Sequence, residues 1–409
     1  MPDELYGKDP DEMTLIIAGR EVVCESMKLL RTMNTCADGL TAVLPWEPGL
    51  DAELDKITAP YSYSECSVYL GGKFQMAGLL YNVAQSRANE GTRKDLEIYS
   101  KTADIIDSTI IPPYEANNIS LTARCKQQCE PFGIEVVLGD GVNLLRERRV
   151  VTRSFSSAGH RRAIPAGIRS INRLLDLRPT TQEVKTNGTW RITGVRIIRE
   201  EEKFRRVSAE QTDMIFEHLR KLAAQKGLLL SCTKWGDLLI TKANVDGEPV
   251  GTITEESPLA MTYSASFSGR DRFAMYRALA PSSRSRRAGS AGVVRDPVVT
   301  APRVLTFQAD DNLPGEAPNA AVWRKNKSAA DSMNISFPVT SWYAPNGKLW
   351  EPNTTVTVIS PTIGLKGGFT FLITQVEYNF SASGANATLQ LKPPTTYTTG
   401  EVIEPWLSE

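Results

Sequence analysis

The stretch SAEQTDMIFEHLRKLAAQKGLLLSCTKWGDLLITK, residues 208–242, predicts a helix that runs into a β-hairpin. Ser208 and Gln211 have the spacing of a capping box, so we expect the helix to begin there. Gly227 suits the left-handed position at which a helix ends. Between these ends, apolar residues recur at helical spacing and predict one buried face: Ile215, Leu219 and Leu222.

Two strands follow this helix, and a shorter copy of the same arrangement lies upstream. The apolar run 228–230 and the strand 238–241 flank the turn KWGD. Upstream, residues 120–130 predict a helix that ends at Pro131, and residues 134–138 predict a strand. We therefore expect two helix–strand units inside a chain that is otherwise patterned for β structure.

The first 110 residues or so predict a small antiparallel β domain. Strands are expected in 13–23 and 38–46, and the two-glycine turn in SVYLGGKFQMAGLLYNV (67–83) predicts a hairpin. Residues 96–109 predict a strand that runs into a turn or short helix. From the alternation in these segments and the helical stripe above, we predict the following core residues: Phe74, Met76, Leu219, Leu222 and Phe371.

Residues 141–206 have a different composition, with sixteen Lys or Arg against six Asp or Glu. We interpret this segment as an insertion with some β structure, including a strand at 189–198. It could be a charged loop facing solvent or an acidic partner, or a nucleic-acid contact, although aromatic residues for base stacking are few. The arginines that we take as candidate partner contacts are Arg146, Arg148, Arg149, Arg161 and Arg162.

The last third of the chain returns to β patterning. Residues 250–280 predict a strand pair, and SSRSRRAGSAG (282–292) predicts an exposed loop. Residues 296–409 are again patterned for β structure, with many Pro, Thr and Asn, and the clearest strands are 354–360, 369–378 and 387–392.

Composition restricts the classes of protein. The chain has 409 residues, and its 47 basic and 47 acidic residues cancel. No global charge therefore favours nucleic acid or a membrane surface. No apolar run has the length of a membrane helix and the N-terminus lacks a signal-peptide pattern, so we expect synthesis and retention in a reducing cytosol. In that compartment the six cysteines are expected to be small core residues.

The sequence offers little chemistry. We expect His160 to lie in a solvated loop and His218 to be a partly buried structural residue. Cys125 and Cys129 are one helical turn apart, but a second ligand pair for zinc is missing, which favours a core stripe. Phosphate-binding loops, dinucleotide fingerprints and nucleophile elbows are also missing from the sequence. We therefore name no catalytic, cofactor or metal residue and predict that the protein is not an enzyme.

The order of these motifs resembles the front half of the phage Mu baseplate hub family (tail protein P). The matching segments in 60–170 are SVYLGGKFQMAGLLYNVAQS, LEIYSKTADIIDST and SLTARCKQQCEPFGIEVVL. Those in 207–280 are QTDMIFEHLRKLAAQKGLLLSCTKWGDLLITKA and SFSGRDRFAMYRALA. The basic segment departs from the family pattern, and the C-terminal region is not aligned.

The resemblance implies an α+β, mainly β chain that assembles as a trimeric ring and contains several antiparallel, barrel-like domains. The expected domains are a first tube-like barrel (1–110), a helix–strand unit with the basic insertion (111–206), a helix–hairpin unit (207–258) and a second tube-like barrel (259–409). The implied function is a structural hub that adapts the sixfold tail tube to the threefold central spike and lines the DNA channel. Its implied partners are its own copies, the spike, the tube or tube-initiator protein and the surrounding wedge proteins.

Two alternatives belong to other classes. A tail-associated cell-wall hydrolase would need paired carboxylates whose pKa values differ in a pocket. A nucleic-acid-binding module would use the basic insertion and lose affinity steeply with salt.

Overall fold

The structure, a computed structural model, describes residues 3–88, 91–157, 188–257, 263–279, 291–308 and 317–397. They belong to two compact units, one of residues 143–203 and the other of the rest of the chain. Antiparallel strands dominate and helices are short, which confirms the predicted α+β, mainly β class. The finer division into four domains stays a prediction.

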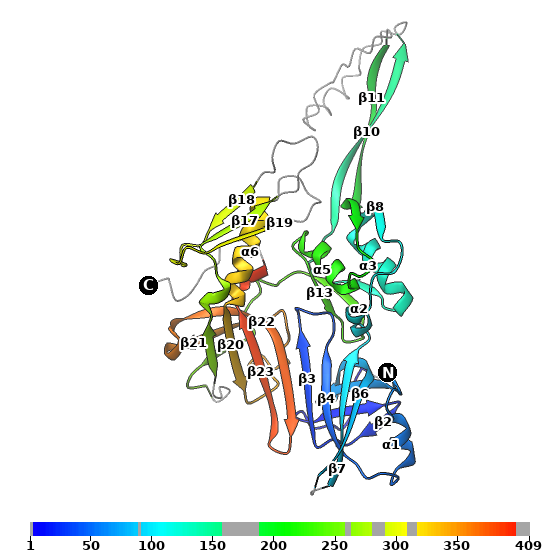
Figure 1. Ribbon diagram of the computed structural model, residues 1–409, viewed down its shortest axis with the longest axis vertical. Helices are drawn as coiled ribbons and strands as arrows, with labels where there is room; N and C mark the ends of the chain where they lie inside the picture. Colours follow the sequence, from blue (N-terminus) through cyan, green and yellow to red (C-terminus); the bar gives the residue numbers. More distant parts are fainter. Residues whose placement is uncertain are drawn as a thin grey trace. The chain divides into compact units, whose positions relative to one another are not determined.

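A thirteen-stranded sheet organises the larger unit (Figure 1). Eight of its strands form one layer in which every neighbouring pair is antiparallel. This eight-stranded layer contains, in spatial order, β16 (Ser264–Phe267), β20 (Met333–Val339), β23 (Gly384–Lys392), β22 (Leu365–Ser381), β3 (Ser26–Thr32), β4 (Gly39–Pro45), β7 (Gly91–Ser100) and β6 (Lys73–Ala88).

The seam between β22 and β3 joins the two ends of the chain. Gln375 lies opposite Thr32, and Phe380 lies opposite Met27. The N-terminal and C-terminal strands therefore share one continuous set of backbone hydrogen bonds, so they form a single rigid layer.

A second layer covers the buried face of the first. It is reached through the two longest strands of the sheet, because the N-terminal part of β6 pairs with β5 and that of β22 pairs with β21. The strands of this layer are β5 (Glu65–Leu70), β1 (Met13–Ile17), β2 (Arg20–Val22), β21 (Thr355–Ser360) and β15 (Thr252–Thr254). Alternate residues of both layers fill one apolar core. All five predicted core residues are buried: Phe74, Met76, Leu219, Leu222 and Phe371.

The eight-stranded layer is an internal repeat. The order β3–β4–β7–β6 in its first half matches β16–β20–β23–β22 in its second half. The long strand of each half has a register shift at the same place, between Leu80 and Asn82 in β6 and between Ile373 and Gln375 in β22. The repeat extends to β5 and β21, which pair in the same way with β6 and β22, but no further. The next strands differ, because β1 pairs with β5 antiparallel whereas β15 pairs with β21 parallel.

The two predicted helix–strand units pack together into one small α/β module. The strand of the first unit lies parallel to a strand of the second, and the two helices contact each other. Gly227 has φ +67° and ends the second helix as predicted. The module contains α2 (Ala103–Asp107), α3 (Leu121–Cys129), β9 (Val136–Leu138), α5 (Ile215–Ala224), β13 (Leu229–Cys232) and β14 (Leu238–Thr241).

The predicted capping box at Ser208 is wrong. Ser208 ends strand β12 (Lys203–Ser208), which pairs with β8 (Glu115–Ser120). The helix begins only at Ile215, whose N–H donates to the carbonyl of Ser108 at 2.9 Å. A backbone partner from a distant segment therefore satisfies this helix end, and no side-chain cap is formed.

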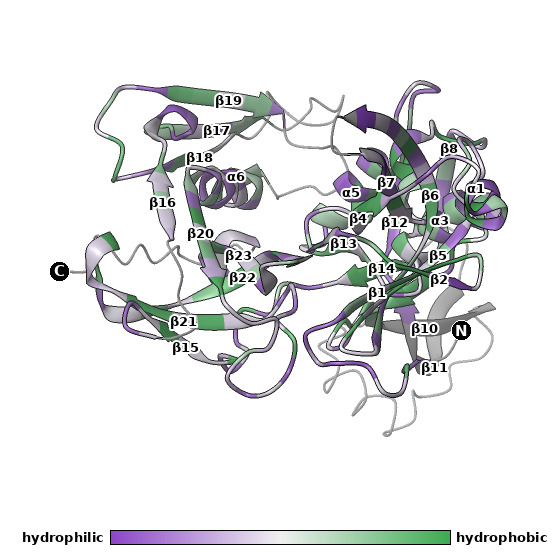
Figure 2. Cartoon of the chain, turned by 90° about the horizontal axis from the view of Figure 1, so that it is seen from below, coloured by the Kyte–Doolittle hydropathy of each residue, from purple (hydrophilic) through white to green (hydrophobic). Residues whose placement is uncertain are grey.

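The C-terminal third contains a helix that was not predicted from the sequence. Residues beyond 296 are patterned for β structure and no helix was predicted there, yet α6 (Ala317–Asp331) packs on β17 (Met275–Leu279) and β18 (Ala291–Arg295) and touches β20 (Figure 2). The strand β19 (Val304–Gln308) completes that small sheet. The strand pair predicted in 250–280 is also wrong, because β15, β16 and β17 each pair elsewhere.

In the smaller unit, residues 143–203, the described residues form an antiparallel pair of β10 (Leu145–Ser157) and β11 (Gly188–Glu201), which confirms that the insertion has β structure. The remaining short elements among the described residues are α1 (Ala52–Ile57), η1 (Glu130–Phe132), η2 (Gly269–Asp271), η3 (Pro361–Ile363) and η4 (Pro394–Tyr397).

Candidate assembly surface

The eight-stranded layer has one buried face and one polar face. Its buried positions alternate with positions that are exposed or partly exposed, as expected for strands with water or a wet channel on one side. Most side chains on the second face are amides and hydroxyls. The polar face includes Lys28, Thr41, Asn82, Asp95, Glu97, Ser264, Ser266, Asn334, Ser336, Gln375, Glu377, Asn379, Asn386, Thr388 and Gln390, with Leu30 and Val43 among its few apolar residues.

Side chains on the polar face bond to each other across neighbouring strands. Such pairs hold the side chains flat against the sheet and balance their charges locally. The distances are 2.8 Å for the ion pair Lys28–Glu377, 3.3 Å for Gln390–Ser336 and 3.1 Å for Asn379–Asn386.

The layer ends in two strand edges. Among the described strands, β16 pairs only with β20, and residues 82–88 of β6 pair only with β7. Since eight antiparallel strands alternate in direction, β6 and β16 run in opposite directions. A second copy of the layer could therefore continue the sheet antiparallel at either edge.

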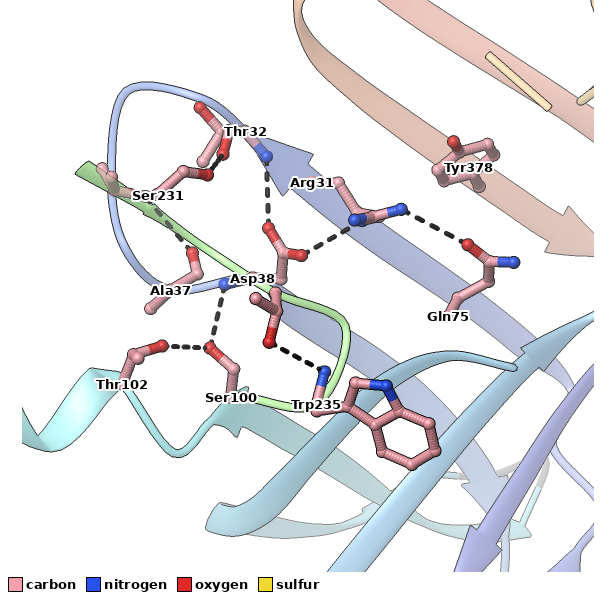
Figure 3. Close-up of polar contacts among 12 residues, drawn as sticks. Arg31, Thr32, Ala37, Asp38, Gln75, Ser100, Thr102, Ser231, Trp235 and Tyr378 are labelled. Carbon is pink, nitrogen blue, oxygen red and sulfur yellow. Dashed lines mark hydrogen bonds and ion pairs between the residues drawn. The ribbon is translucent and has the colours of Figure 1, made fainter. Parts of the chain in front are cut away.

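Beneath the seam lies a buried polar cluster (Figure 3). The Arg31 guanidinium donates to the Asp38 carboxylate at 3.1 Å and to the Gln75 side chain at 3.3 Å. Asp38 also accepts from the N–H of Thr32 at 3.2 Å. Burial is the largest influence and lowers the pKa of Arg31, but Asp38, together with smaller contributions from Tyr378 and Glu351, outweighs it and raises that pKa above its usual value.

The cluster ties the α/β module to the large sheet. Ser231, on β13, donates its hydroxyl to the carbonyl of Thr32 at 3.1 Å. The Ser100 hydroxyl accepts from the N–H of Asp38 at 3.1 Å and lies 2.8 Å from the hydroxyl of Thr102. These contacts connect β3, β4, β7 and β13 at one point, so we interpret the cluster as structural.

A second buried polar group lies inside the α/β module. His218 is 7% exposed, and its Nε2 has no hydrogen-bond partner. Burial, together with the nearby charge of Arg124, lowers the pKa of His218 to about 4. The imidazole is therefore neutral at physiological pH, as expected for a structural histidine.

The candidate contact residues are only partly covered by the structure. Arg146, Arg148 and Arg149 lie on strand β10, where the backbone is described. Arg161 and Arg162 lie outside the described residues, and so does His160.

The six cysteines are buried, which confirms their prediction as core residues. In the described part of the chain, groups of three or more His, Cys, Asp or Glu that could hold a metal are not found. Within the same residues, the helices are too short or too polar to cross a bilayer. A cavity of about 660 Å³ lies beside the N-terminal segment, and its lining mixes both charges: Asp3, Glu4, Lys73, Lys234, Lys348 and Glu351.

The comparisons with known proteins agree with this architecture. Residues 314–400 match the family model for the fourth domain of the Mu phage baseplate assembly protein GpP. The 43 kDa tail protein of prophage MuSo2 from Shewanella oneidensis is 21% identical, with a TM-score of 0.67 over 95% of this chain and 98% of that chain. The tail protein from Neisseria meningitidis MC58 is 17% identical, with a TM-score of 0.68 over the same shares.

The resemblance to the Mu-like baseplate hub family is confirmed. None of the curated proteins compared with the chain matches it. The region matched by the Mu-like family model contains α6, β20, β21, β22 and β23, which is the part that could not be aligned from motifs alone. The two tail proteins establish the fold over nearly the whole chain.

The two unpaired strand edges were not identified from the sequence, because their residues are chemically plain. The strand edges consist of NVAQSRA (82–88) and SASF (264–267), in which Arg87 is the one charged residue and no unusual motif occurs. Their low charge is the one signal that could have indicated them, since exposed edges normally carry several charges or a proline.

Proposed function

We propose that this chain is the structural hub of a contractile phage or phage-like tail baseplate. Three copies join their eight-stranded layers edge to edge into a closed barrel. The barrel adapts the sixfold tail tube to the threefold central spike, because each chain contributes two copies of the repeated half-layer. The polar face lines the channel through which DNA passes.

The observation that carries the proposal is the seam between β22 and β3. There, one half-layer already continues into the other by antiparallel pairing within the chain. The equivalents of β22 and β3 in the repeat, β6 and β16, lie at the two ends of the layer. Repeating the seam between copies therefore closes a ring without open edges.

The polar face supports the channel assignment. The lining is mainly amides and hydroxyls; Lys28 pairs with Glu377 and Arg93 with Asp95, which leaves Glu97 as one further carboxylate, so the face presents little net charge to a moving polyanion. Phosphates are therefore neither trapped by a basic wall nor repelled by an acidic one.

The partners follow from this position. The spike lies below the ring, the tube or tube-initiator protein lies above it, and wedge proteins surround it. We assign the basic segment 141–206, with Arg146, Arg148, Arg149, Arg161 and Arg162, to contact with one of these proteins. In this function the protein is a virion component made in the host cytoplasm, acts without an enzyme activity or cofactor, and does not insert into a membrane.

Oligomeric mass tests the proposal. The chain has a mass of 45.0 kDa, so light scattering should give three times that value, either alone or after co-expression with the spike protein. A monomer under both conditions would refute the ring. Release of peptidoglycan fragments by the purified chain would favour the hydrolase alternative, and salt-sensitive DNA binding by the basic segment would favour the nucleic-acid alternative.

A further inference from the structure

We infer the register of the joint between protomers: residues 83–86 of β6 pair antiparallel with residues 264–267 of β16 in the next copy. This inference rests on the proposed ring and adds to it the identity of the residues that meet. It follows from treating the β22–β3 seam as the template for the joint.

The two half-layers can be superposed residue by residue through their strand pairings. The register shifts fix the first correspondence, because each lies immediately before Asn82 in β6 and Gln375 in β22. One row across the first half then reads Asn82, Glu97, Thr41 and Lys28. The matching row across the second half reads Gln375, Gln390, Ser336 and Ser264.

The seam then gives the register of the joint. Within the chain, Glu377 lies opposite Leu30 and Asn379 lies opposite Lys28. Substituting the corresponding residues places Ala84 opposite Ser266 of the next copy. The same substitution places Ser86 opposite Ser264 of the next copy.

The faces of the two strands agree with this register, although face was not used to derive it. Ala84 and Ser266 are exposed on the polar face, so both would border the channel. Val83 packs against the apolar core and would lie opposite Phe267. Phe267 is 54% exposed and lies on the core side, because its partner within the chain is the buried Met333. A slip of one residue would exchange these faces.

The composition of both edges also favours a paired state. The paired positions 83–86 and 264–267 contain no Lys, Arg, Asp, Glu or Pro, and the first charge on the β6 edge is Arg87, just beyond them. Edge strands that stay free in solution usually carry such residues to prevent pairing. The matched edges are therefore suited to another copy of this chain.

Cysteine cross-linking tests the register in the native oligomer, isolated alone or with the spike protein. In the double variant Ala84→Cys/Ser266→Cys, facing Cα atoms would lie about 5 Å apart, within the range for a disulfide. Within one chain the two positions lie on opposite edges of eight strands, about 34 Å apart, so they cannot join. Mild oxidation should give covalent dimers and trimers on a denaturing gel, and the buried native cysteines should not contribute.

The matched control is Ala84→Cys/Ser264→Cys, in which the second thiol is displaced by two residues, or about 7 Å along the strand. We expect at least about tenfold less cross-linked product from this control. If the protein is trimeric by mass but the control cross-links as well as the test variant, the register is wrong while the ring stands. If the protein is monomeric by mass and neither variant cross-links, both proposals fail.

Discussion

His218 should make the α/β module sensitive to acid. A folded-state pKa of about 4, against an ordinary value near 6.5, means that folding favours the neutral imidazole. The contribution to stability is therefore fully present above pH 6.5 and is lost as the pH falls from 6.5 to 4. Proton linkage gives a loss of about 2 kcal/mol between pH 8 and pH 5, and about 3 kcal/mol when titration is complete.

The surroundings of His218 give the reason for this direction. Burial is the main cause, and Arg124 on α3 and Lys221 on α5 add positive charge, while Asp213 opposes them only in part. A proton on the imidazole would thus enter a buried site next to a buried guanidinium. The module must loosen to hydrate it.

Two measurements check this prediction. The chain has two histidines, so ¹³C-labelled imidazole signals can be assigned with a His160→Gln variant and titrated separately. The free energy of unfolding is then compared at pH 8 and pH 5 for the wild type and for His218→Gln, which stays neutral. We expect the variant to lose about 2 kcal/mol less than the wild type over this range. Titration of His218 near 6.5, or equal losses in the two proteins, would refute the reasoning.

Three further predictions concern other parts of the fold. A Cβ at Gly292 would lie 2.2 Å from backbone atoms of α6, so Gly292→Ala should lower the melting temperature, whereas Gly269→Ala meets open space and should change it little. Arg31→Met and Asp38→Asn each remove one member of the buried ion pair, and each should lower the free energy of unfolding in denaturant by about 3–5 kcal/mol. The double variant should lose less than the sum of the two, and simple additivity would contradict coupling between the residues. Glu255 accepts three hydrogen bonds, and these hold its pKa at about 2. The stability that it contributes is therefore present above about pH 4.5 and is lost as the pH falls from 4.5 to 2. Glu255→Gln should flatten that part of an acid-unfolding curve, and an unchanged curve would contradict the assignment.

Local signals in the sequence predicted local structure well. The stripe of Ile215, Leu219 and Leu222 lies in a buried helix, and the glycines at 71 and 72 turn a hairpin with positive φ. Each of these features depends on residues only a few positions apart. Periodicity and backbone freedom are sufficient to specify them.

The failures arose where distant segments decide the structure. The start of α5 is set by the backbone of Ser108, so the residues around Ser208 gave a misleading cap. Helix α6 is rich in alanine, a strong helix former, but it also contains proline and asparagine. It packs on Ala278, Gly292, Val294 and Phe307, which belong to other segments. The seam between β22 and β3 could not be predicted, because the sequence of neither strand indicates which strand it pairs with.

The repeat within the eight-stranded layer has a consequence for the thermodynamics of assembly. In the proposed trimer, three of the six junctions between half-layers lie within a polypeptide and form as it folds. Only the other three depend on protein concentration, so completing the ring costs the translational and rotational entropy of two associations, whereas six separate half-layers would need five. Fusion of two half-layers in one gene thereby lets a ring close at dilutions where an unlinked hexamer would fall apart.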